Sequence, residues 1–169
     1  EYAERMARDV KEARQDRAGR PKLLTALNAQ HISAYWRDPD FRRVHDQFDE
    51  VVADGESVVR ASRAFCAVGL PERVATTDFI HDAARVAARD GISFYVLGAD
   101  EAVNAKAYER LEREYPGLRI VGRHHGYLGP DDEARVVAEI AEKGPDVLWV
   151  GMGAPKQHFF MARHRDSLR

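Results

Sequence analysis

The sequence predicts an α/β protein, a single domain in which helices cover both faces of a mostly parallel sheet. Segments with apolar residues at helical spacing alternate with short strand-like segments along the chain. The strands of the second half are apolar almost throughout, which is typical of parallel strands that are buried on both faces. The length of 169 residues is enough for one domain with a sizeable core.

The first half of the chain opens on a helix pattern. Tyr2, Met6, Val10 and Ala13 recur at helical spacing within residues 1–16. The further elements expected in this half are a strand at 22–28, a helix at 29–47 with a boundary at Asp38-Pro39, a strand at 50–55, and helices at 56–68 and 76–91. For the helix at 76–91 we expect Thr77 as the N-cap and Gly91 as the C-terminal stop.

The second half of the chain repeats a strand followed by a helix three times. The expected strands are at 92–98, 118–122 and 146–151, and the expected helices are at 100–117, 130–145 and 155–168. Connections between parallel strands of one sheet are right-handed. In such sheets ligands bind where the C-terminal ends of the strands open into loops, so the residues that follow the strands are the candidates for a binding site.

Composition excludes several classes of protein. Lys and Arg number 26 and Asp and Glu number 28, so the net charge of -2 gives no sign of a nucleic-acid binder. A single cysteine excludes a disulfide within the chain and favours a cytoplasmic location. No apolar run approaches the ~18 residues that a membrane span needs.

Some apolar side chains are expected to be buried. Cys66 lies in an apolar helical setting, where a free cysteine usually behaves as a small core hydrophobe. Ile32, Tyr35 and Trp36 share the helix that begins near residue 29. Their spacing allows contact with lipid, but packing in the core is the preferred interpretation.

The stretch from Gly151 to Gln157 joins the last strand to the last helix. Gly151 and Gly153 bare backbone N–H groups, and Pro155 is suited to the first helical turn. Lys156 and Gln157 then project from a helix start, where an anion is attracted. The alternative is a plain turn with solvated side chains. A dinucleotide fingerprint is disfavoured because Lys156 stands where its third glycine belongs.

Asp54 follows the second expected strand directly. A carboxylate at this position can face the ligand cleft and act as a general base on a hydroxyl nucleophile. Equally, Asp54 can cap the helix that begins near Glu56. From the residue types alone, the roles of general base and helix cap are equally supported for Asp54.

Other polar residues near strand ends allow two interpretations each. Thr25 and Asn28 can bind a ligand or make a turn and cap. Arg73 can clamp a phosphate or form an ion pair with Glu72 or Asp78. The adjacent residues His124 and His125 lack the spacing of a metal site, so no metal is expected there.

Together these segments resemble a known family. The stretches "VVADGESVV", "PERVATTDF" and "GAPKQ", with the block "YPGLRIVGRHHGY", resemble the WecG/TagA/CpsF glycosyltransferases. The likeness runs from about Lys22 to Leu168. It implies a Rossmann-like fold, and a glycosyltransferase domain over residues 1–169 that lacks the N-terminal strand pair and the C-terminal segment of the family.

The resemblance also implies an activity. Members transfer a sugar, commonly N-acetylmannosamine, from a UDP-sugar to a polyprenyl-diphosphate-linked sugar, with inversion and without a metal or other cofactor. The products feed teichoic acids and other cell-surface polysaccharides. The lipid-linked acceptor implies peripheral contact with the inner face of the cell membrane.

Matching positions carry the implied roles. Asp54 inherits the role of general base, Thr25 and Asn28 line the donor and acceptor pocket, and Gln157 lies near the nucleotide-sugar. The candidate substrate-binding residues are Thr25, Asn28, Gly55, Arg73, Gly98, Gly126, Tyr127, Gly151, Gly153, Pro155, Lys156 and Gln157. Without a metal, Lys156, Arg73 and helix N-termini have to offset the charge of the leaving UDP.

The sequence departs from the family pattern in three places. His158 replaces a Glu after "GAPKQ", Thr76 replaces a Gly, and Glu56-Ser57 replaces Gly-Val after the Asp-Gly pair. These departures keep other interpretations open. They are a relative with a glucuronyl or other hexosyl donor, a non-catalytic relative, and, with less support, a dinucleotide-dependent oxidoreductase.

Overall fold

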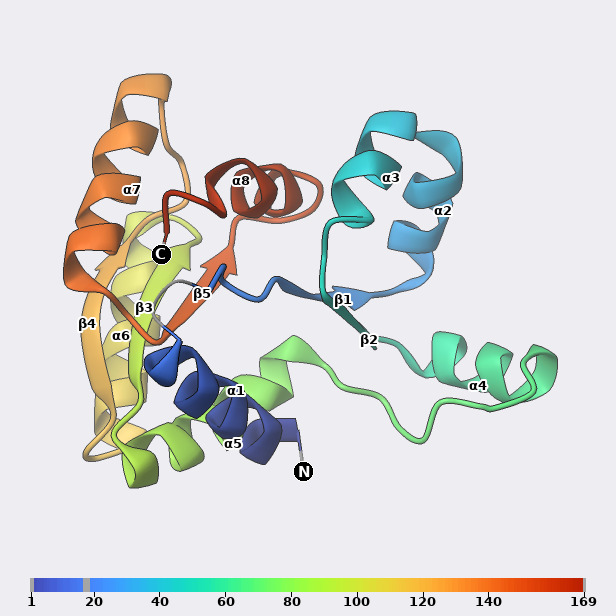
Figure 1. The fold of residues 1–169 in the computed structure, drawn as a ribbon, viewed down its shortest axis with the longest axis horizontal. Coiled ribbons are helices and arrows are strands. Elements are labelled where there is room, and N and C mark those ends of the chain that lie inside the picture. Colours follow the sequence, from blue (N-terminus) through green and yellow to red (C-terminus); the bar gives the residue numbers. More distant parts are fainter. Residues whose placement is uncertain (1, 17–18, 169) are drawn as a thin grey trace. The chain divides into compact units, whose positions relative to one another are not determined.

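The computed structural model describes residues 2–16 and 19–168 (Figure 1). Within these residues helices and strands alternate as the sequence pattern predicts. Their bounds are α1 (Tyr2–Gln15), β1 (Leu24–Leu27), α2 (Ala29–Arg37), α3 (Pro39–His45), β2 (Glu50–Ala53), α4 (Glu56–Phe65), α5 (Thr76–Asp90), β3 (Ser93–Gly98), α6 (Glu101–Glu114), β4 (Arg119–His124), α7 (Pro130–Lys143), β5 (Val147–Gly151) and α8 (Lys156–His164). The α/β class and the expected elements are confirmed.

The chain divides into two compact units, which we name after their sheets. The three-strand unit comprises Glu1–Pro21, His81–Gly153 and Arg163–Arg169, and the two-strand unit comprises Lys22–Ile80 and Ala154–Ala162. All described strand pairs are parallel, as predicted, but the strands form two sheets where the sequence pattern predicts one. The apolar pattern identifies strands and their buried faces without specifying which strands pair.

The three-strand unit is built around β3. Its sheet has the order β4-β3-β5, so β3 is hydrogen-bonded on both edges and its side chains form the core. Phe94 and Tyr95 have no exposed surface and Leu97 has 1%. Helix α6 packs against β3 and β4, and in Figure 1 it lies behind the sheet. The nearly continuous apolar run of β3 is explained by this burial on both faces.

The two-strand unit pairs β1 with β2 from Leu24–Glu50 to Leu27–Ala53. Helices α2 and α3 pack on each other, and α2 contacts β1. The core of this unit includes Phe41, Val59 and His158, each with at most 1% of its surface exposed. The C-terminal ends of β1 and β2 lie side by side, so the loops that follow them start at the same edge of the sheet.

Helix ends follow local chemistry in most places. Asp38 caps α3 by accepting hydrogen bonds from the N–H groups of Asp40 and Phe41, which explains the boundary predicted at Asp38-Pro39. Gly91 has a φ of +64°, so it ends α5 as predicted. The Thr77 cap is wrong: α5 begins one residue earlier, and the carbonyl of Ala75 accepts the first helical N–H groups.

Two predictions of burial are wrong. Cys66 is exposed; it follows the last residue of α4, and the neighbouring Phe65 and Val68 are 88% and 86% exposed. Trp36 is 72% exposed and Ile32 is 36% exposed, so neither is a core residue. Helical spacing predicts which side chains share a face, but not whether another element covers that face. Of the helices in the described ranges, none combines the length and the apolar character needed to cross a membrane.

Candidate functional site

In the two-strand unit, predicted site residues converge at the C-terminal ends of β1 and β2. The backbone N–H of Asp54 donates to the carbonyl of Leu27 over 2.9 Å, which holds the end of β2 beside the end of β1. The Cα of Gly55 is so close to Asn28 that a Cβ on Gly55 would lie 4.0 Å from the Cβ of Asn28. Asn28, Asp54 and Gly55 are therefore neighbours, as the rule on strand ends predicts.

Asp54 does not serve as a helix cap. The N-cap of α4 is Gly55, and no side chain completes the cap. Asp54 is half-buried, and among the described residues its carboxylate has no hydrogen-bond or ion-pair partner. The capping interpretation of Asp54 is therefore wrong, and both carboxylate oxygens remain able to accept a proton.

Asn28 does cap a helix. It is the N-cap of α2: its side-chain oxygen accepts the N–H of His31 over 3.0 Å, and its own N–H donates to Nδ1 of His31 over 3.3 Å. The reciprocal pair satisfies backbone groups at the start of α2. It also fixes the tautomer of neutral His31, because a nitrogen that accepts a hydrogen bond leaves the proton on Nε2.

His31 lies in the electrostatic field of Asp54. Burial lowers the pKa of His31, the neighbouring His45 lowers it further, and the negative charge of Asp54 opposes the shift. The sequence interpretation missed His31, although a histidine three residues after an Asn cap signals this reciprocal arrangement.

The start of α8 joins the same region through His158. Its Nε2 lies 2.9 Å from the hydroxyl oxygen of Thr25, and the rings of His158 and His31 are 5.3 Å apart between centroids. His158 follows Lys156 and Gln157 directly, so these contacts pack the first turn of α8 against β1 and the first turn of α2. Lys156 is exposed and Gln157 is half-buried.

Thr25 and His158 face the core. Thr25 is 7% exposed and His158 has no exposed surface. The ring of His158 packs against those of Phe41 and Phe48, with centroids 5.1 Å and 5.4 Å away. The hydroxyl of Thr25, expected to line the pocket, is thus paired inside the protein.

The aromatic core shifts the acid–base behaviour of His158. Burial first, and then the neighbouring His31 and His45, lower the pKa of His158 to about 4. Its Nδ1 is buried and has no partner among the described residues. His158 is therefore neutral at physiological pH and supplies no charge to a ligand.

Arg73 lies alongside the end of β2. The N–H of Val74 donates to the carbonyl of Ala53 over 2.8 Å, so Arg73 and Asp54 are each one residue from this bond. Its guanidinium pairs with Asp78 over 2.7 Å, as one interpretation predicts. Both side chains are largely exposed, and such pairs are worth about 0–1 kcal/mol, so an anionic ligand can displace Asp78.

Of the other predicted residues, Pro155 belongs to the two-strand unit, and the rest belong to the three-strand unit, where glycines bring the strand ends into close contact. Gly98 has a φ of +150°, and a Cβ on it would lie 2.4 Å from the carbonyl oxygen of Gly151. A Cβ on Gly126 would lie 3.0 Å from the Cα of Gly98. The N–H of Gly126 donates to the carbonyl of Ala99 over 2.8 Å. Glycine is required at Gly98 and Gly126 because neighbouring backbone atoms occupy the space that a side chain would need.

Asn104 was missed by the sequence interpretation and holds these strand ends together. It is 2% exposed, and its amide nitrogen donates to the carbonyls of Gly98 and His124, each over 3.0 Å. Its side-chain oxygen accepts from Arg123 over 3.2 Å. The sequence feature that could have identified Asn104 is an Asn on the buried face of a helix that follows a strand, because a buried amide needs hydrogen-bond partners.

The remaining predicted residues of these loops are on the surface. Tyr127 is 74% exposed, and Gly151, Gly153 and Pro155 are exposed as well. The departures from the family pattern at Glu56 and Thr76 are also exposed, and Glu56 pairs with Arg60 over 3.1 Å. In the part of the chain that the structure describes, no three His, Cys, Asp or Glu side chains are grouped as a metal site would need.

Comparison with known proteins identifies the family. Residues 2–169 match the model of the "Glycosyl transferase WecG/TagA/CpsF family". The chain is 30% identical over 131 residues to the N-acetylglucosaminyldiphosphoundecaprenol N-acetyl-beta-D-mannosaminyltransferase of Bacillus spizizenii. That alignment covers 76% of this chain and 49% of the relative, so the chain spans about half the length of the relative. The chain therefore belongs to the WecG/TagA/CpsF family of glycosyl transferases.

Proposed function

We propose that the full-length protein transfers a sugar of the N-acetylmannosamine type from a UDP-sugar to a polyprenyl-diphosphate-linked sugar acceptor, with inversion at the anomeric carbon. Membership of the family supports the reaction class. The name of the Bacillus relative supports the sugar and the lipid-linked acceptor. The proposed place of action is the cytoplasmic face of the membrane, where a lipid-linked acceptor is within reach.

The observation that carries the proposal is the carboxylate of Asp54, which has no hydrogen-bond or ion-pair partner among the described residues. It lies in the two-strand unit at the end of β2, beside the end of β1 and the segment after Arg73. In an inverting transfer, Asp54 takes the proton of the acceptor hydroxyl while that oxygen bonds to the anomeric carbon. The bond from that carbon to UDP breaks on the opposite side, and UDP leaves with the electron pair.

The leaving diphosphate needs positive charge and hydrogen-bond donors. Lys156 supplies a full charge at the first residue of α8, where the N-terminal dipole also favours an anion. Arg73 supplies a second charge when the diphosphate displaces Asp78. Gln157 offers a donor and an acceptor to the nucleotide-sugar.

His31 is proposed to orient the base. Because Nδ1 of His31 accepts a hydrogen bond from the N–H of Asn28, the Nε2–H of His31 is free to donate. Burial lowers the pKa of His31 and the negative charge of Asp54 opposes that shift, so the two side chains interact electrostatically. A donor held in this way can orient the Asp54 carboxylate by a hydrogen bond.

The test is a transfer assay on the full-length protein with UDP-N-acetylmannosamine and a lipid-diphosphate-linked N-acetylglucosamine. Replacing the base in Asp54→Asn is expected to lower kcat by about 100-fold or more. Asp40→Asn is the matched control, because Asp40 is an exposed carboxylate on α3 that pairs with Arg43 on the same helix. Transfer by Asp54→Asn within a few-fold of the wild-type rate would reject Asp54 as the base.

Magnesium dependence tests the charge assignment separately. If Lys156 and Arg73 offset the charge of UDP, transfer continues in excess EDTA and falls in Lys156→Ala. Transfer that stops in EDTA and recovers with Mg²⁺ would contradict that assignment.

A further inference from the structure

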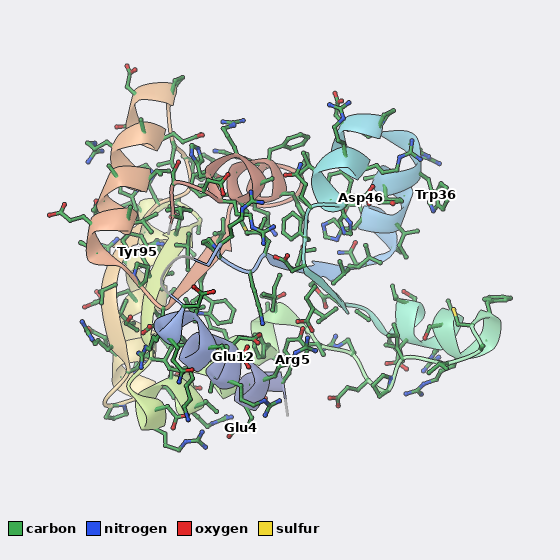
Figure 2. The ribbon with its side chains drawn as sticks, viewed as in Figure 1. Glu4, Arg5, Glu12, Trp36, Asp46 and Tyr95 are labelled. Atoms are coloured by element: carbon green, nitrogen blue, oxygen red, sulfur yellow. The ribbon has the colours of Figure 1, made fainter. Side chains whose placement is uncertain are left out.

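An apolar groove lies on the two-strand unit, next to the candidate base. It has a volume of about 470 Å³ and is lined by Leu27, Ile32, Tyr35, Trp36, His45, Asp46, Phe48 and Val51. The lining comes from β1, β2, α2, α3 and the turn after α3. Figure 2 labels Trp36 on α2 and Asp46 after α3. The volume is in the range of sites that hold a small organic molecule.

Large apolar side chains of this groove are open to solvent. Trp36 is 72% exposed, Val51 42% and Ile32 36%. Single exposed apolar residues are ordinary, but several that line one groove mark a surface that binds an apolar partner. The aromatic pair at the rim, Tyr35 and Trp36, packs edge to face with ring centroids 5.8 Å apart. Such residues are typical of surfaces that lie between water and hydrocarbon.

Two of the polar side chains that line the groove, Tyr35 and Asp46, are paired with each other. The hydroxyl of Tyr35 donates to Asp46 over 2.8 Å, and the guanidinium of Arg42 lies 6.0 Å from the centroid of the Tyr35 ring. Nε2 of His45 has no hydrogen-bond partner among the described residues, and it is buried. The walls therefore offer apolar contact and few unused hydrogen bonds, which suits a hydrocarbon chain and not a sugar or a nucleotide.

The groove is continuous with the candidate catalytic region. Leu27 lines the groove, and its carbonyl accepts the N–H of Asp54 over 2.9 Å. Val51 lines it from the adjacent strand, three residues before Asp54. A substrate with its reacting hydroxyl at Asp54 and an apolar tail would reach this groove without leaving the two-strand unit.

We propose that this groove binds the first isoprene units of the lipid that carries the acceptor sugar. This proposal rests on the proposed function, which supplies a polyprenyl-diphosphate-linked acceptor. The reacting sugar lies at Asp54, and the isoprenoid chain packs on Ile32, Trp36 and Val51. The exposed aromatic rim then meets the membrane from which the lipid emerges.

A binding experiment tests the groove without any sugar transfer. The full-length protein carrying Trp149→Phe keeps Trp36 as the tryptophan of this groove, and farnesyl diphosphate is the probe. Farnesyl diphosphate is expected to shift the emission of Trp36 to the blue and to protect it from acrylamide, whereas inorganic diphosphate does neither. The same binding in Ile32→Asp and in the wild type would overturn the proposal. Protection of Trp36 from acrylamide before farnesyl diphosphate is added would also overturn the proposal. Protection that grows with protein concentration would show that a second copy covers the groove, and protection that does not would show that the rest of the chain covers it.

A transfer experiment separates the groove from the reaction itself. We compare kcat/KM for acceptors whose diphosphate carries either a long isoprenyl chain or a methyl group. Ile32→Asp is expected to reduce the preference for the isoprenyl acceptor about tenfold, the size expected for loss of one buried aliphatic contact. Val68→Asp is the matched control, because Val68 is an aliphatic residue of the same unit that is 86% exposed outside the groove.

The two proposals fail in different ways. Farnesyl diphosphate that binds at Trp36 in a protein without transfer activity would reject the proposed function and keep the groove as an isoprenoid site. Transfer with an unchanged preference for the isoprenyl acceptor in Ile32→Asp would reject the groove and keep the function.

Discussion

Acidification is expected to destabilise the two-strand unit through His158. The folded state holds the pKa of His158 at about 4, against an ordinary value of 6.5. Below pH 6.5 the unfolded chain therefore binds a proton that the folded chain does not, so stability falls as the pH drops from 6.5 towards 4. Above pH 6.5 this residue contributes no pH dependence.

The magnitude follows from the size of that difference. One pH unit is worth about 1.4 kcal/mol, so His158 alone costs the folded state about 3 kcal/mol by pH 4. His31 on α2 and His45 on α3 act in the same direction, since burial lowers the pKa of each. Asp54 and Asp46 oppose the shifts of these two histidines and do not reverse them.

The assay is urea unfolding between pH 7 and pH 4.5, followed by the fluorescence of Trp36 in the Trp149→Phe protein. Trp36 belongs to the two-strand unit and Trp149 to the three-strand unit, so the reciprocal Trp36→Phe protein reports the other unit. His158→Gln removes the titrating group while keeping a side chain that can hydrogen-bond Thr25, and its stability is expected to vary less with pH. An equally steep pH profile in His158→Gln, or a His158 ring that titrates near pH 6.5 by NMR, would refute the reasoning.

Three further predictions concern the three-strand unit and the surface. Asn104→Ala is expected to lower the free energy of unfolding by about 1–3 kcal/mol, because the carbonyls of Gly98 and His124 lose a buried donor. Urea unfolding followed by Trp149 fluorescence measures this loss, and a loss below experimental error would contradict the role of Asn104. Gly98→Ala is expected to destabilise the same unit, because its Cβ would meet Gly151; an unchanged melting temperature would count against this close approach. The exposed Cys66 is expected to react with a thiol reagent in the native protein as fast as in urea, and protection in the native state would show that Cys66 is covered.

Sequence patterns predicted the helices and strands for physical reasons that act locally. The apolar run of β3 and the glycine at position 91 define where a strand and a helix end, without knowledge of other segments. The position of Asp54 after β2 follows from the general rule that parallel strands present their C-terminal ends to ligands.

The parts that sequence patterns did not predict depend on contacts between distant segments. His158 is buried because α8 packs against Thr25, which lies 133 residues away along the chain. Asn104 acts on carbonyls of β3 and β4 that only the pairing of those strands brings together. Trp36 on α2 and Cys66 directly after α4 lie in stretches whose residue pattern predicts burial, and their exposure is decided by which elements cover them.

The close packing of Gly98, Gly126 and Gly151 has a consequence for protein engineering. Since no side chain fits at Gly98 or Gly126 without moving a neighbouring strand end, this rim cannot be redesigned by point mutation at those two positions. A designer who wishes to alter what the rim accepts is left with the side chains around it, such as Tyr127, or with a new loop. The backbone at Gly98 and Gly126 therefore has to stay as it is, and only the surrounding side chains and loops can be changed.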